Sequence, residues 1–161
     1  MIAVDPGSRL LGYAVFVSGE AGLLIKSSGV CSIPMVSHGE KLLYVFNFFC
    51  DLFVSMREEF GDFVCVFVVE KVFLGKSVSS SFCLFSFYSH IFFIASYLGC
   101  SCFDFLAVEV KKFLVGSGQA SKSEVEKVVC LIFPCILLGM PSDLYDAVAL
   151  GYYYIMRHPF S

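Results

Sequence analysis

The chain has 161 residues, of which 58% are hydrophobic, and carries a formal net charge of −3. A chain of this length can bury a substantial core, so we expect a single domain over residues 1–161. The acidic balance lacks the general signature of a nucleic-acid-binding protein, although acids gathered at a metal site mask basic residues elsewhere.

The first predicted strand ends in a carboxylate. The apolar run of residues 2–4 leads into Asp5, and Pro6-Gly7 follows as a strong turn pair. An ionised Asp at the end of a buried strand is costly unless a cation lies beside it. Asp5 is therefore either the cap of an Asx-type turn or a functional acid, and this stretch alone leaves both open.

Two further extended stretches, residues 12–18 and 22–33, predict a three-stranded meander. A helix is then expected from Ser37 to residue 59, because Ser37 and Glu40 have the spacing of a capping box. An apolar stripe with helical spacing follows the box, and we interpret it as core.

A second carboxylate ends the next predicted strand. Residues 63–69 form a continuous run rich in β-branched and aromatic side chains, as in strands buried on both faces, and Glu70 follows. The alternative for Glu70 is a structural role, in which it reaches solvent and pairs with Lys71.

Strands and helices alternate in the rest of the chain. The expected elements are a helix over 78–98, a strand over 103–107, a short helix around Lys111 and Lys112, a capped helix over 121–132 and a helix over 143–157. Three strands in hairpins followed by this alternation predict an α/β fold with a five-stranded mixed sheet and helices on both faces.

Residues 77–103 contain no Lys, Arg, Asp or Glu, and this run is long enough to span a bilayer. Its serines, His90 and Gly99 and the scarcity of basic flanks favour a buried helix, so we expect no membrane association. A helix that is apolar all round must be covered on both sides, which predicts a second subunit.

The chain has eight cysteines but no Cys-x-x-Cys pair. Most lie in apolar runs, where cysteine behaves as a small hydrophobic residue. Without a recognisable secretion signal, we expect free thiols and a cytoplasmic location.

The last helix adds two acids, Asp143 and Asp146, which share a helix face. Acids at a helix N-terminus also interact well with the helix dipole, so this pair alone is weak evidence. Together with Asp5 and Glu70, however, it predicts four converging carboxylates. Such a cluster suits Mg²⁺, and two ions about 4 Å apart can promote phosphodiester cleavage.

Five segments together resemble the RuvC family of Holliday-junction resolvases. They are Asp5-Pro6-Gly7-Ser8-Arg9 with Gly12-Tyr13, Glu70 with Val72-Phe73, Val110-Lys111, Gly116 and Gly118 with Lys122-Ser123, and Asp143 with Asp146-Ala147. The resemblance implies a ribonuclease-H-like fold, a homodimer and metal-dependent, symmetric nicking of four-way DNA junctions. It also implies two Mg²⁺ ions per site, with Mn²⁺ as a substitute, and raises a branch-migration helicase complex as a partner.

The resemblance assigns Asp5, Glu70, Asp143 and Asp146 as catalytic and metal-binding carboxylates. It assigns Phe73, Lys76, Lys111 and Lys122 to DNA binding. Lysines can neutralise phosphates, and an apolar ring can hold distorted bases apart. The alternatives are ordinary core for Phe73 and solvated surface for Lys111 and Lys122.

The chain also departs from the family pattern. Residues 86–90 lack the glycines and the arginine usual in that segment, and few basic residues follow up to Arg157. We therefore expect weaker, more salt-sensitive or partner-assisted DNA binding. Three rivals remain: another ribonuclease-H-like nuclease, a junction-binding module without turnover, and an actin-like phosphate site, which would need a longer chain.

Overall fold

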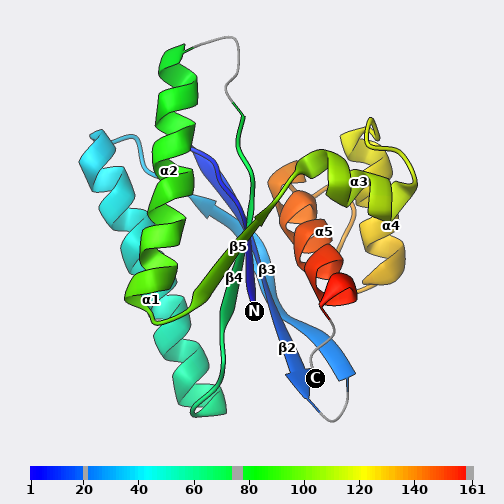
Figure 1. Cartoon of the computed structure of the whole chain (residues 1–161), viewed down its shortest axis with the longest axis horizontal. Coiled ribbons are helices and arrows are strands. Elements are labelled where there is room, and N and C mark those ends of the chain that lie inside the picture. Colours follow the sequence, from blue (N-terminus) through cyan, green and yellow to red (C-terminus); the bar gives the residue numbers. More distant parts are fainter. Residues whose placement is uncertain (20–21, 74–77, 159–161) are drawn as a thin grey trace.

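The computed structural model describes residues 1–19, 22–73 and 78–158, and its centre is a five-stranded mixed sheet (Figure 1). The strands are β1 (Ile2–Asp5), β2 (Leu10–Gly19), β3 (Gly22–Ser32), β4 (Val66–Glu70) and β5 (Ser101–Phe105). Their spatial order is β3-β2-β1-β4-β5. The meander β1-β2-β3 is antiparallel, whereas β4 runs parallel to both β1 and β5.

Helices cover both faces of the sheet (Figure 1). The helices α1 (His38–Phe60) and α2 (Val78–Tyr97) pack on one face. The helices α3 (Ala107–Val115), α4 (Lys122–Ile132) and α5 (Ser142–Arg157) pack on the other. This is the α/β architecture that the element order predicted.

The strand alternation assigns each side chain of β1 and β4 to one of two cores. Ile2 and Val4 point into the core beneath α1 and α2, whereas Ala3 points into the core beneath α5. In β4, Val69 points toward α2 and Val68 toward α5. Because side chains alternate along a strand, Asp5 and Glu70 follow on the α5 face.

Local capping chemistry fixes where two helices begin. The Ser37 hydroxyl accepts the Glu40 N–H, and the Glu40 carboxylate accepts the Ser37 N–H. Ser121 and Glu124 make the same reciprocal pair at the start of α4. Both predicted capping boxes are therefore confirmed.

Two predicted strand boundaries are wrong by a few residues. The strand expected from residue 63 begins at Val66, and the Val64 side chain is 93% exposed rather than buried. The strand expected over 103–107 covers 101–105. Helix α3 begins at Ala107, and the Leu106 N–H just before it donates to the Glu109 carboxylate at 3.3 Å. Apolar content alone did not distinguish strand from loop or helix start.

The apolar helix α2 is covered on one side only by this chain. Phe87, Ile91 and Ile94 are buried against the sheet, whereas Phe82 is 70% exposed. Among the described residues, α2 is the one helix that is long and apolar enough to cross a membrane. Its buried face packs against β4 and β5, as the face of a core helix does.

Strand β2 and helix α5 approach each other very closely at Gly12. A Cβ atom at this position would lie 1.9 Å from the main-chain oxygen of Asp143, which is far inside van der Waals contact. Only a residue without a side chain allows this approach. Gly12 therefore sets the distance between the sheet and the start of α5.

We predict that Gly12→Ala lowers the free energy of unfolding by at least about 2 kcal/mol, because the strand and helix must move apart. Urea denaturation followed by circular dichroism measures this change. Gly39→Ala is the matched control, because no atom lies within 4 Å of the added Cβ. This control should be neutral or stabilising by up to about 1 kcal/mol, and equal losses in the two variants would contradict the steric explanation.

Candidate active site

The backbone register brings the two strand-end carboxylates together. Val4 pairs with Val69 in the parallel ladder of β1 and β4, so Asp5 and Glu70 are the next residues on neighbouring strands. Asp5 also pairs with Gly12 of β2. Since Gly12 lies against the backbone of Asp143, three neighbouring strands and the N-terminal turn of α5 meet at one point.

Helix α5 adds Asp143 and Asp146 to this point. The Asp146 side chain is only 14% exposed, and both α5 acids interact electrostatically with Asp5 and Glu70. The structure thus brings together the four carboxylates that the sequence singled out. The Asp5 side chain is therefore part of a cluster of acids.

Burial and mutual repulsion make the charged forms of Asp5, Glu70 and Asp146 costly. Burial raises the pKa of Asp5 well above its usual value, and the charges of Glu70, Asp146 and Asp143 raise it further. Burial and Asp146 raise the pKa of Glu70 to about 7. The pKa of Asp146 is also raised, chiefly by burial. The cluster therefore favours a bound cation.

Two lysines supply part of the opposing charge. The Lys122 ammonium lies 3.8 Å from a carboxylate oxygen of Asp146 and donates a 2.8 Å hydrogen bond to the Ser142 hydroxyl. Lys111 interacts electrostatically with both Glu70 and Asp146 and lowers the pKa of each. Both lysines therefore lie beside the acids, and the Lys122 side chain is at the same time 64% exposed to solvent.

The donor set fits a hard divalent cation. Carboxylate oxygens from two strand ends and one helix are the ligands that Mg²⁺ prefers, and a cation among them would relieve their repulsion. In the described part of the chain, no three His, Cys, Asp or Glu side chains already enclose a metal position.

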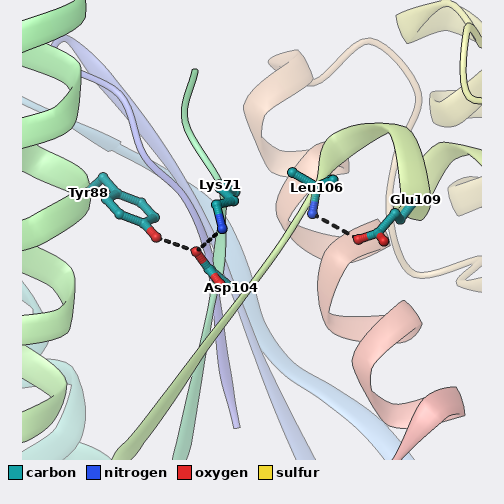
Figure 2. A network of polar contacts seen from close by, with 5 residues as sticks. All are labelled: Lys71, Tyr88, Asp104, Leu106 and Glu109. Carbon is teal, nitrogen blue, oxygen red and sulfur yellow. Dashed lines mark hydrogen bonds and ion pairs between the residues drawn. The ribbon is translucent and has the colours of Figure 1, made fainter. Parts of the chain in front are cut away.

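Lys71, the residue after Glu70, pairs with Asp104 and not with Glu70 (Figure 2). The Lys71 ammonium lies 3.5 Å from the Asp104 carboxylate on β5, which also accepts a hydrogen bond from the Tyr88 hydroxyl on α2. The Lys71 N–H donates to the Phe105 carbonyl at 2.9 Å. Pairing of Glu70 with Lys71 was the structural alternative for this acid, and the structure instead shows Lys71 held by Asp104.

Of the other two predicted DNA-binding residues, the structure describes Phe73 but not Lys76. Phe73 is 64% exposed, so it is not ordinary core. Lys76 lies outside the described residues.

In the divergent segment 86–90, the Ser86 hydroxyl bonds to the His38 ring at 2.8 Å and the His90 ring to the Leu42 carbonyl at 2.9 Å. These contacts hold α2 against α1 and give the segment a structural function within the chain.

Sequence reasoning missed three supporting residues. Ser142 precedes the helix expected over 143–157 and has no predicted role, yet its hydroxyl accepts the hydrogen bond from Lys122. Gly12 and Asp104 act through strand register and cross-strand contact, which a one-dimensional pattern does not contain. The one available signal was Gly12 in the segment that carries the family resemblance.

Comparison with known proteins gives consistent results. The family model described as crossover junction endodeoxyribonuclease RuvC matches residues 1–153. A RuvC from Carboxydothermus hydrogenoformans is 23% identical over 152 residues, which cover 94% of this chain and 92% of the relative. A RuvC from Thermomicrobium roseum is 28% identical over 154 residues, covering 96% and 91%.

Two solved structures share the fold. Thermus thermophilus RuvC superposes with a TM-score of 0.76 at 22% identity, covering 98% of this chain and 97% of that one. The same protein in complex with Holliday junction substrate gives a TM-score of 0.77 at 19% identity, covering 99% and 97%. The predicted ribonuclease-H-like fold is thereby confirmed.

We predict that Asp5→Asn raises the free energy of unfolding in a chelator by about 1–2 kcal/mol at pH 8, because it removes a buried, repelled charge. Because the pKa of Asp5 is raised in the folded state, the unchanged protein loses stability as the pH rises. The stability gained by Asp5→Asn should therefore shrink toward pH 5. Asp51→Asn, on the exposed surface of α1, is the control and should change stability little. A loss of stability in Asp5→Asn at pH 8 would contradict the repulsion.

Proposed function

The chain belongs to the RuvC family of crossover junction endodeoxyribonucleases, which resolve Holliday junctions, and we propose that it cleaves with Asp5, Glu70, Asp143 and Asp146. The observation that supports this assignment is the convergence of four acids at one end of the sheet, flanked by Lys111 and Lys122. The substrate is four-way junction DNA, and cleavage is metal-dependent phosphodiester hydrolysis.

The four carboxylates would hold two Mg²⁺ ions. When bound, such ions make a water more acidic and stabilise the leaving oxygen. Asp5 and Glu70 approach this position from the strands, and Asp143 and Asp146 approach it from α5. Because the carboxylates come from separate elements, the fold fixes their relative positions before DNA arrives.

The flanking lysines and one aromatic ring contact the DNA in this proposal. Lys122 is oriented by its hydrogen bond to Ser142, so its ammonium can neutralise a phosphate beside the acids. Lys111 adds a second positive charge at the same site. The exposed ring of Phe73 can press against bases at the junction centre, and Lys76 is a further predicted contact.

A second copy of the chain is the proposed partner of α2. Apart from the buried face of this helix, its exposed apolar side chains are Val78, Phe82, Phe85, Phe93 and Tyr97. An exposed apolar surface of this kind favours association. A homodimer would also supply the two sites that paired nicking needs. A branch-migration helicase complex and a cytoplasmic location stay predictions.

We predict that Asp5→Asn lowers the rate of junction cleavage by at least about 1,000-fold, because it removes a metal ligand. Junction affinity should stay the same or rise, because the variant loses a negative charge near the phosphates. Gel-based nicking and fluorescence anisotropy with Mg²⁺ measure the two effects. Asp51→Asn should behave as the unchanged protein, and full cleavage by Asp5→Asn would overturn the assignment.

The substrate comparison separates this function from its rivals. The unchanged protein should nick a four-way junction at paired positions and leave linear duplex and RNA–DNA hybrid intact. Preferential cleavage of the hybrid would indicate a different ribonuclease-H-like nuclease. Junction binding without Mg²⁺-dependent nicking would indicate a binding module.

For the dimer, we predict that Phe82→Asp shifts the chain from dimer to monomer, because it places a charge in an apolar interface. Light scattering coupled to size-exclusion chromatography measures the mass. Leu131→Asp on α4 is the matched control, because Leu131 is a similarly exposed apolar residue (78%) away from α2. A dimer that persists in Phe82→Asp, or that is lost equally in Leu131→Asp, would contradict association through α2.

A further inference from the structure

A second group of reactive atoms lies at the opposite end of the sheet from the carboxylates. Asp5 and Glu70 end β1 and β4, whereas Met1 and Cys65 precede the same strands and Cys100 precedes β5. With a rise of about 3.3 Å per residue, these two ends are roughly 13 Å or more apart. The cysteines therefore lie outside the carboxylate cluster.

Strand register makes Cys65 and Cys100 direct neighbours. Val66 pairs with Ser101 in the parallel ladder, so the residues just before them, Cys65 and Cys100, face each other across β4 and β5. Neighbouring strands lie about 4.8 Å apart, which falls within the roughly 4.4–6.8 Å between Cα atoms of disulfide-bonded cysteines. The Cys65 thiol bonds to the Val66 carbonyl at 3.9 Å and the Cys100 thiol to the Leu98 carbonyl at 3.7 Å. The two thiols are close enough for Cys65 to raise the pKa of Cys100.

Both thiols line a cavity of about 300 Å³ that also touches Phe53, Arg57 and Leu98. Cys65 is buried, whereas Cys100 is only partly buried and is the more accessible of the two. An oxidant that enters the cavity can therefore reach Cys100 first, and the Cys65 thiol lies next to it for the second step. Cys102 is the neighbouring competitor, but it pairs with Phe67 across the ladder and so has no thiol opposite.

We propose that Cys65 and Cys100 are a reversible oxidation site. A small-molecule disulfide such as oxidised glutathione oxidises the two thiols, and they form an intramolecular disulfide. The Cys100 thiolate attacks one sulfur of the oxidant and releases one thiolate. The Cys65 thiolate then displaces the second from the mixed disulfide. Two cysteine protons are lost, one S–S bond forms in the protein, and the oxidant is reduced to two thiols.

The surroundings make this reaction slow but its product compatible with burial. Burial raises the pKa of Cys100 to about 12, so its thiolate is scarce at neutral pH. The disulfide carries no charge and needs no counter-ion in the apolar core. Cross-linking residues 65 and 100 ties the start of β4 to the end of α2 and the start of β5.

The test is to incubate the full-length protein with oxidised glutathione between pH 7 and pH 9 and to map peptides without reduction. We expect a Cys65–Cys100 peptide that has lost two hydrogens, a rate that rises about tenfold per pH unit, and reversal by dithiothreitol. The midpoint of thermal unfolding should rise by roughly 5 °C or more, because the closed loop restricts the unfolded chain.

Two variants make the result specific. Cys100→Ser should abolish both the cross-link and the thermal shift, whereas Cys102→Ser should retain both. Cys135 is exposed and serves as an internal control for oxidant activity. The proposal is overturned if Cys135 reacts while Cys65 and Cys100 stay reduced at pH 9, if both carry stable glutathione adducts, or if Cys100 pairs with Cys102 or with another molecule.

Discussion

The repulsion among four partly buried carboxylates is the constraint on which the rest of this structure depends. A fold that brings Asp143 together with Asp5, Glu70 and Asp146 raises the pKa of the last three, so their charged forms become more costly. The two-sided apolar core, the close contact at Gly12 and the flanking lysines hold the acids in place against this repulsion. The packing of the apolar core thus offsets the repulsion at a site whose carboxylates suit a cation.

Much of the site could be predicted from the sequence because its carboxylates stand at element boundaries. Asp5 and Glu70 interrupt apolar runs where an acid is out of place, and the Asp143 and Asp146 spacing fits one helix face. The capping serines before α1 and α4 were equally readable, since capping depends on residues within four positions. Local chemistry therefore determined the features that were predicted correctly.

The features that were missed depend on contacts between distant segments. Whether Val64 joins a strand depends on its neighbours in the sheet, and the apolar run alone gave the wrong boundary. The choice of Lys71 between Glu70 and Asp104 depends on which face of the sheet each side chain occupies. Likewise, the covered fraction of α2 depends on what packs beside it, which its uncharged and largely apolar sequence does not encode.

The separation of the two cores by the sheet has a consequence for how two copies could act on one substrate. The acids lie on the α5 side, whereas the exposed apolar side of α2 belongs to the opposite layer (Figure 1). In two chains joined through α2, both sheets would lie between the two sets of acids, so the two sites would not share ions or protons. Coupling between the two cuts would then depend on the geometry of the bound DNA. The protein pair would contribute a fixed distance between the two sites.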